Sequence, residues 1–573
     1  MVTWQEVVAQ KRSDREKLLE PYKLPESALP PKDDLYVYDF FDKGGADSLL
    51  SAKEKEITAI DDIDTLAAKI REGVYSATEV ISAYIKRATV AHQLTNALSE
   101  VVFEQALARA KELDEYYAKE GKTVGKYHGV PLTLKDQFNV YGVDTTLGYV
   151  GRANNPVMDK SKEAVLVTIF EKEGAVVIAK TNLPQSIMWC ECENPLWGCT
   201  VNPRRRDFTS GGSTGGEGAL LALKASIMGW GTDLGGSVRI PQVMNGGYGL
   251  RPSAWRIPYE GVPVTIDGQE HVPSVIGPMT RNLDSLISIT KAVIENEPWT
   301  LDPKCIPIPW RQEIFDQYLS KKKFIIGVMK DDGVVRVHPP IERTLREAAE
   351  KLKAAGHEIV EWSAPDLHQE LVPILNKFYI ADGGEDVKSD VNKMGEPFMP
   401  YVEAMVNRGP PISIPEYWHN MVLKRELQKK YLDRWNASGK LTSTSEPIDF
   451  ILAPGCPHTA VPCRKTNWVG YTRVWNGLDY SAAVFPVSKV DKDIDSLNEE
   501  QRAYVPRNDW DSTNWPLCQC LVLNTLVNEM LTEIIDDPET MDGLPVNLQI
   551  VAGRLAEEKL LAVVKRVEEV LNA

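Results

Sequence analysis

Long apolar runs are missing from this chain of 573 residues. The sequence contains no stretch of about eighteen consecutive apolar residues, so it predicts no membrane-spanning helix. The opening stretch, MVTWQEVVAQKRSDREKLLE, is charged and lacks the apolar centre that a secretory signal peptide needs. We therefore expect a cytoplasmic protein that neither spans nor enters a membrane.

Positive charge is also scarce. The chain has 65 Lys and Arg against 81 Asp and Glu, which gives a formal net charge of −16. The basic runs at 204–206 and 321–323 are too short to form the basic patch that nucleic-acid binding requires. We expect no nucleic-acid partner.

Cysteine is rare as well, with 8 residues in the whole chain. The close pairs at 190/192 and 518/520 have a single residue between them, a spacing too tight for a zinc ribbon. We predict buried free thiols in a reducing compartment and no bound metal.

Short β-branched segments alternate with helical patterns along the chain, which indicates an α/β fold. Ser76 and Glu79 form a capping box before a run of apolar residues at helical spacing. The segments that read as strands are 174–182, 324–329, 358–362, 449–454 and 546–551, and those that read as helices include 341–355 and 557–571.

Three regions stand apart from this alternation. Residues 1–54 are predicted to be a helical or extended N-terminal extension that lies on the surface, with prolines in its later part. Residues 365–440 are rich in Met and aromatic side chains, which fits either core or an apolar substrate lining, and core is the preferred interpretation. Residues 490–515 are polar and are predicted to form a surface insertion without chemistry.

The segment from 207 to 241 holds two Gly-Gly-Ser units, at 211–213 and 235–237. Glycine allows backbone N–H groups to approach a ligand closely, so each turn can present a serine hydroxyl beside several donors. That arrangement is typical of an oxyanion hole. Two other interpretations are open: plain turns around a helix over 218–228, and a phosphate cradle, although neither turn carries the lysine of a P-loop.

A serine nucleophile needs a base, and this segment contains no histidine. The nearest in sequence, His128 and His271, lie in loop contexts that suggest no catalytic role. Lys135 follows the apolar, strand-like run 130–134, where burial would lower the pKa of an amine enough for it to act as a base. The alternative for Lys135 is an ordinary solvated side chain.

Five segments in this order resemble the amidase signature family of serine hydrolases: TLKD at 133–136, TNLPQS at 181–186, SGGSTGGEGAL at 210–220, GTDLGGSVRIP at 231–241 and GLPVNLQIVAGR at 543–554. The resemblance runs from about residue 55 to the C-terminus. It implies one large domain over 55–573 with a central mixed β-sheet covered by helices on both faces. The N-terminal extension looks like that of fungal acetamidase-type members, as distinct from the membrane-anchored fatty acid amide hydrolases.

Carried over by position, the resemblance makes Ser237 the nucleophile, Ser213 the bridging serine and Lys135 the base. It also implies a cis peptide bond between Gly212 and Ser213. The backbone N–H groups expected to line the oxyanion hole are those of Leu234, Gly235, Gly236 and Ser237.

Other positions receive supporting roles from the same resemblance. Asp233 and Arg239 are expected to brace the nucleophile loop as an ion pair, and Thr214 to keep a hydroxyl, with its hydrogen bond, beside the relay. Ile187 and the three residues that follow it, Met188, Trp189 and Cys190, occupy the place of the substrate pocket, although the same side chains could equally be core.

These residues favour an amidase that cleaves small aliphatic or aryl carboxamides through an acyl-enzyme intermediate, with no metal or organic cofactor. The resemblance also allows a homodimer. The alternatives are a fatty acid amide hydrolase-like activity, the glutaminase subunit of a tRNA-dependent amidotransferase, and a silent binding protein. The extension and Glu217 weigh against the amidotransferase, and the retention of all three catalytic positions weighs against the binding protein.

Overall fold

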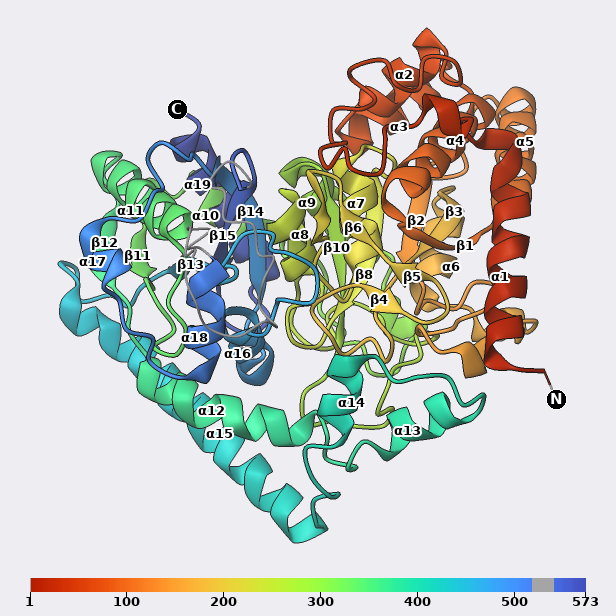
Figure 1. The fold of residues 1–573 in the computed structure, drawn as a ribbon. Helices are drawn as coiled ribbons and strands as arrows, with labels where there is room; N and C mark the ends of the chain where they lie inside the picture. Colours follow the sequence, from red (N-terminus) through yellow and green to blue (C-terminus); the bar gives the residue numbers. More distant parts are fainter. Residues whose placement is uncertain (1, 518–540) are drawn as a thin grey trace.

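A mixed β-sheet of eleven strands runs through the computed structural model, which describes residues 2–517 and 541–573 (Figure 1). Its order is β1-β3-β2-β8-β10-β9-β14-β15-β13-β11-β12. The neighbours are parallel around β2 and around β11 and antiparallel in the centre. These strands are β1 Leu98–Val101, β2 Pro131–Lys135, β3 Val176–Thr181, β8 Met228–Asp233, β9 Tyr248–Arg251, β10 Val275–Thr280, β11 Ile325–Val328, β12 Glu358–Glu361, β13 Phe450–Pro454, β14 Ala482–Lys489 and β15 Pro545–Val551.

Two short hairpins lie outside the sheet, β4 Glu193–Asn194 with β5 Gly198–Cys199, and β6 Val201–Asn202 with β7 Arg205–Thr209. The helices of the N-terminal half are α1 Trp4–Leu19, α2 Ala52–Ala59, α3 Ile63–Arg71, α4 Ala77–Thr95, α5 Phe103–Glu120, α6 Val165–Lys172, α7 Gly215–Ala222, α8 Arg239–Asn245 and α9 Leu283–Glu295. The later helices are α10 Gln312–Ser320, α11 Pro339–Ala354, α12 Pro365–Phe378, α13 Glu385–Asn392, α14 Pro400–Val406, α15 Ile414–Ala437, α16 Gly470–Leu478, α17 Glu499–Arg502, α18 Asp509–Asn514 and α19 Glu557–Leu571.

Helices cover both faces of the sheet, as predicted. Alternate residues of a strand point to opposite faces, so one strand supplies two cores. Ile326 and Phe450 pack with residues of α10, α11 and α19, whereas Ile325 and Ile451 pack with residues of α12, α15 and α16. Burial on both faces explains why these strands read as continuous apolar runs in the sequence.

The strands and helices predicted from the sequence are confirmed, with one error in a helix boundary. The helix expected over 218–228 is α7, which begins at Gly215 and ends at Ala222. Lys224 adopts a left-handed conformation with φ of 57°, which stops the helix and turns the chain toward β8.

The N-terminal extension is attached to the sheet edge through α1 (Figure 1). Arg15 donates to the carbonyl of Leu98 in β1 at 2.7 Å, and its guanidinium lies over the Trp197 ring. Lys11 pairs with Asp144 at 2.9 Å. Within the described residues, no helix has the length and apolarity needed to cross a bilayer.

The segment 490–515, predicted to be a surface insertion without chemistry, has contacts with the rest of the chain. Asp511 is buried and accepts hydrogen bonds from the backbone N–H groups of Arg336 and Arg507. Trp510, one residue earlier, lines the pocket described below. The polar composition of the segment did not predict these contacts, because a few aromatic and capping side chains are enough to hold such a segment in place. Cys518 and Cys520 lie outside the described residues.

The capping box at the start of α4 gives a direct test of the local reasoning. Ser76 Oγ accepts from Glu79 N–H at 3.1 Å, and Ser76 N–H donates to Glu79 Oε2 at 3.0 Å. We expect Ser76→Ala to lower the free energy of unfolding by about 1 kcal/mol, measured by urea denaturation. Thr78→Ala on the same turn is the control, and an equal loss in both variants would contradict the capping role.

Candidate active site

Lys135 is the last residue of β2, a strand that lies in the sheet between β3 and β8. Its side chain is fully buried. The Nζ atom donates to Ser213 Oγ at 2.7 Å and to Thr232 Oγ1 at 2.9 Å. Thr232 in turn donates to Gln137 Oε1 at 2.8 Å. The amine is thus held in one position by two hydroxyl groups.

The environment of Lys135 favours its neutral form. Burial lowers the pKa of Lys135 to about 7, and this effect outweighs the opposing influence of nearby Cys192, Asp233 and Asp136. None of these three groups approaches Lys135 Nζ within ion-pairing distance in the described part of the chain. An amine with this pKa can accept a proton near neutral pH.

Ser213 is the last residue of the first Gly-Gly-Ser unit. The Gly212–Ser213 peptide bond is cis, as the resemblance implied, and the Ser213 side chain is buried. Thr214 N–H donates to the Ser237 carbonyl at 3.2 Å, which holds the two units together. The Thr214 hydroxyl differs from expectation, because among the described residues it has no hydrogen-bond partner. It points instead toward Gly231, where any Cβ would lie 2.5 Å from it.

Glu217 connects two of the five segments that resemble the family, 133–136 and 210–220. Its Oε1 accepts from Thr133 Oγ1 at 2.5 Å, and Thr133 also contacts the Ser226 hydroxyl at 2.5 Å. Burial raises the pKa of Glu217 to about 7. The carboxyl group therefore packs in the core with a reduced tendency to ionise.

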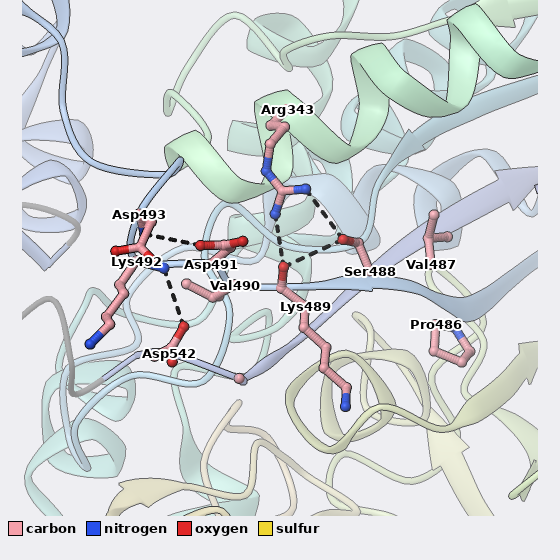
Figure 2. Close-up of a pocket in the computed structure, with 11 residues that line it drawn as sticks. Arg343, Pro486, Val487, Ser488, Lys489, Val490, Asp491, Lys492, Asp493 and Asp542 are labelled. Atoms are coloured by element: carbon pink, nitrogen blue, oxygen red, sulfur yellow. Dashed lines mark hydrogen bonds between the residues drawn. The ribbon is translucent and has the colours of Figure 1, made fainter.

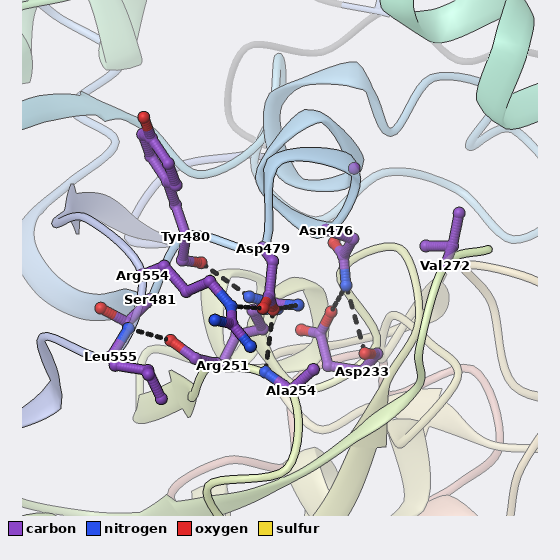
Figure 3. A network of polar contacts seen from close by, with 12 residues as sticks. Asp233, Arg251, Ala254, Val272, Asn476, Asp479, Tyr480, Ser481, Arg554 and Leu555 are labelled. Carbon is purple, nitrogen blue, oxygen red and sulfur yellow. Dashed lines mark hydrogen bonds and ion pairs between the residues drawn. The ribbon is translucent and has the colours of Figure 1, made fainter. Parts of the chain in front are cut away.

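The loop after β8 is organised around the Asp233 carboxylate. Arg239 forms a two-pronged pair with it, Nε to Oδ2 and Nη2 to Oδ1, each at 3.0 Å, and both side chains are fully buried. Asn476 Nδ2 donates to Oδ1 at 2.8 Å (Figure 3). Burial acts to raise the pKa of Asp233, but the facing guanidinium overrides it and holds the pKa at about 2.

This arrangement decides which backbone N–H groups face the pocket. Gly236 N–H donates to Asp233 Oδ1 at 2.8 Å. This N–H group is therefore engaged within the loop, whereas the prediction placed it in the oxyanion hole. The N–H groups of Leu234, Gly235 and Ser237 have no partner among the described residues, and these three residues line the cavity. Three of the four expected N–H groups are therefore unpaired among the described residues, and their role as oxyanion donors stays a prediction.

Position 236 requires glycine. Its φ is +131°, a conformation that other residues rarely adopt, and a Cβ there would lie 2.2 Å from Thr472 Oγ1. The close approach lets the Thr472 hydroxyl donate to the Gly235 carbonyl at 2.7 Å. Helix α16, which carries Thr472, is thereby packed directly on the loop.

A cavity of about 200 Å³ opens at Ser237. Ile187 lines it with a positive φ of 58°, which is uncommon for a β-branched residue and marks a constrained loop. Trp189 stacks on Tyr401 with ring centroids 4.9 Å apart. The lining residues are Ile187, Met188, Trp189, Cys190, Leu234, Gly235, Ser237, Ile240, Asn376, Tyr379, Met405, Arg408, Asn467, Val469, Arg473 and Trp510. Residues 187–190 are therefore pocket wall, and the Met- and aromatic-rich region contributes both core and lining.

Sequence reasoning missed the part of the site that comes from α12 and α16. Tyr379, just after α12, donates to the Leu234 carbonyl at 3.2 Å. The end of α16 is fixed by Asp479, which accepts from Arg251 at 2.9 Å and from Arg554 at 2.6 Å (Figure 3). No local motif signals Tyr379 or Asp479, because only the order of the sheet brings them to the loop, whereas Arg554 is the last residue of the segment 543–554.

Figure 2 shows the lining residues of a second cavity, whose volume is about 740 Å³. Arg343 of α11 donates there to the Ser488 hydroxyl and to the Lys489 carbonyl at the end of β14. The rest of its described lining comes from residues 486–493, 542 and 543. The cavity thus shares no residue with the candidate site.

Comparisons with known proteins agree with this fold. The sequence matches the family profile described as Amidase over residues 79–561. It is 46% identical to Amidase 1 of Gibberella moniliformis over 90% of this chain and 94% of that protein, and 38% identical to an acetamidase of Emericella nidulans over 100% and 98%. The structure resembles that of a fatty acid amide hydrolase with a TM-score of 0.88 and 32% identity, covering 100% of this chain and 95% of that chain.

The fold and these matches define an amide hydrolase. The chain belongs to the amidase signature family, and its curated relatives include fungal amidases and acetamidases. The N-terminal extension does not set it apart from every fatty acid amide hydrolase, because the structural match covers the extension too. The family resemblance is confirmed, and the match to the acetamidase also covers the whole of this chain, its N-terminal extension included.

Loss of the Asp233 charge should destabilise the whole loop. We expect Asp233→Asn to lower the free energy of unfolding by about 3–5 kcal/mol, because it leaves the Arg239 guanidinium buried without a counter-ion. The double variant Asp233→Asn/Arg239→Met should regain part of this loss in the same urea titration. A single variant that unfolds at the wild-type urea concentration would refute the bracing role.

Proposed function

We propose that this amide hydrolase cleaves small aliphatic or aryl carboxamides to a carboxylate and ammonia or an amine, with Ser237 as nucleophile, Ser213 as proton bridge and Lys135 as base. The observation that carries the proposal is the 2.7 Å contact between Lys135 Nζ and Ser213 Oγ, both buried, behind a cavity that Ser237 lines. A buried amine that is hydrogen-bonded to a hydroxyl can accept its proton and so activate a neighbouring serine.

The first step transfers a proton along this line. Neutral Lys135 accepts the proton of Ser213, and Ser213 accepts that of Ser237 as its oxygen attacks the amide carbon. The tetrahedral oxyanion is stabilised by the N–H groups of Leu234, Gly235 and Ser237, which are free of other partners in the described chain. The relay then returns a proton to the leaving nitrogen as the C–N bond breaks.

The second step hydrolyses the acyl-enzyme. A water molecule takes the place of the amine, gives a proton to the relay and attacks the ester carbonyl, which releases the carboxylate and restores Ser237. Because all the groups involved belong to the chain itself, we propose that the reaction needs no metal or organic cofactor.

The cavity favours a short acyl group. Its volume of about 200 Å³ is below the range of about 300–1,000 Å³ that is usual for drug-sized ligands. Asn467 Oδ1 lines the cavity and has no hydrogen-bond partner among the described residues, so it can accept an N–H of a carboxamide. A fatty acyl amide would need a longer channel than the described residues form.

The remaining alternatives receive less support. Glutamine carries an ammonium group, and the described cavity lining contains no Asp or Glu to receive it. A silent binding protein would have no need to keep Lys135 and Ser213 in hydrogen-bonding contact inside the core. A homodimer stays a prediction from the family resemblance.

Ammonia release from a panel of amides tests the reaction. Wild-type enzyme should hydrolyse acetamide, a medium aliphatic amide, benzamide or indole-3-acetamide in preference to glutamine. Ser237→Ala should lower the rate by at least about 10⁴-fold, because no other group replaces the nucleophile. The exposed Ser161→Ala is the matched control. Ammonia release that persists in Ser237→Ala would remove Ser237 from the mechanism.

The pH dependence of kcat/KM tests the base. Below its pKa of about 7 Lys135 is an ammonium ion and cannot accept a proton, so wild-type kcat/KM should rise with pH through about 7. Lys135→Ala should remove this rise and lower kcat/KM by about 10²–10⁴-fold, with Ser213→Ala intermediate because water can partly replace a bridging hydroxyl. The exposed Lys119→Ala serves as control. An unchanged profile in Lys135→Ala would exclude it as the base.

A further inference from the structure

The cavity beside Ser237 contains a buried positive charge that lacks an ion-pair partner in the described chain. Arg473 of α16 lines it and is only 8% exposed. Its Nη1 donates to Asn376 Oδ1 at 2.7 Å, while its Nε is buried without a partner among the described residues. Arg408 lines the same cavity from an exposed position. Neither guanidinium forms an ion pair in the part of the chain that the structure describes.

The surroundings of Arg473 do not neutralise it. Its guanidinium lies over the Trp468 ring, 4.8 Å from the centroid. The carboxylate of Asp332 also influences it, but Asp332 is engaged by Trp468 Nε1 and by backbone N–H groups, and it forms no ion pair with Arg473. Arg408 adds a repelling positive charge, and burial lowers the pKa of Arg473. A buried and unpaired cation is costly unless a ligand supplies the counter-ion.

The position of Arg473 also limits the size of that ligand. Thr472, the preceding residue, is hydrogen-bonded to the Gly235 carbonyl, and the Arg473 Cβ lies 3.6 Å from where a Cβ on Gly235 would be. The base of the Arg473 side chain is therefore anchored next to the loop that carries Ser237, and its guanidinium lines the same cavity. An anion that reaches it shares one cavity of about 200 Å³ with the reacting amide.

We propose that the cavity selects short amides that carry a carboxylate, with Arg473 pairing with this carboxylate while the amide carbonyl lies at Ser237. The inference rests on the hydrolase function proposed above and names its substrate class. Arg408 attracts the same group at the cavity mouth. In a chain with net charge −16, two unpaired guanidinium groups in one cavity concentrate positive potential where the substrate enters.

The chemistry of the reaction is unchanged by this choice. The amide C–N bond breaks, water supplies the new C–O bond and the proton for the leaving nitrogen, and the second carboxylate remains a spectator. A guanidinium offers several N–H donors in a planar fork, which suits a carboxylate. Glutamine meets this requirement poorly, because its ammonium group would lie beside Arg473 and Arg408.

The test compares succinamate with butyramide, in which a methyl group replaces the carboxylate. Wild-type kcat/KM should favour succinamate by about tenfold or more, as expected for a charge-assisted hydrogen bond. Arg473→Gln should abolish this preference, Arg473→Lys should keep part of it, and Arg408→Gln should weaken it. Arg346→Gln, which changes the same charge at an exposed site of α11, is the control and should keep the wild-type ratio. Using the ratio cancels losses that a structural defect imposes on both substrates.

A binding measurement separates this inference from the hydrolase proposal. Calorimetry on Ser237→Ala should show succinamate binding that is lost in Ser237→Ala/Arg473→Gln, and N-acetylglycine shows whether the carboxylate also fits on the leaving group. If wild-type enzyme cleaves neither amide but succinamate still binds through Arg473, the function proposed above fails and the ligand class stands. If wild-type enzyme cleaves butyramide and succinamate with equal kcat/KM, or if Arg473→Gln keeps the wild-type ratio of the two kcat/KM values, the ligand class is wrong.

Discussion

The candidate site depends on the buried pair between Asp233 and Arg239. Its carboxylate accepts hydrogen bonds from Gly236 N–H, Val238 N–H and Asn476 as well as from the guanidinium. The carboxylate thus engages the Gly236 N–H, whereas the N–H groups of Leu234, Gly235 and Ser237 have no partner among the described residues. One ion pair thus organises the hydrogen bonds of the loop, and under the proposed mechanism this preorganises the donors that stabilise a developing oxyanion.

Burial supplies the second requirement of the proposed mechanism, an amine whose pKa is lowered to about 7. Lys135 ends a strand that is covered on both faces, and the hydroxyls of Ser213 and Thr232 hold its amine without adding a countercharge. Arg473 is also buried, but its side chain stays charged because a guanidinium does not readily lose its proton. Under the two proposals, the buried amine of Lys135 serves proton transfer and the buried guanidinium of Arg473 serves binding.

Much of this could be predicted from the sequence, and the limits are physical. The α/β fold, the strands and the α4 capping box follow from local patterns of burial and hydrogen bonding. The positions of Lys135, Ser213 and Ser237 follow from segments that resemble a family. The end of α7 was missed because Lys224, with no glycine signal, adopts the left-handed turn. Asn476 and Arg473 were missed because only long-range strand order brings α16 to the loop, and Tyr379 was covered only by the general prediction of core or lining for residues 365–440.

The most direct test of the account is the labelling of Ser237 by a fluorophosphonate, followed by peptide mass spectrometry. The account predicts that the label is found on Ser237 alone, that the labelling rate rises as pH passes through about 7, and that Lys135→Ala suppresses it. Labelling at another residue, or a rate on Ser237 that is indifferent to both pH and Lys135, would contradict the proposed relay.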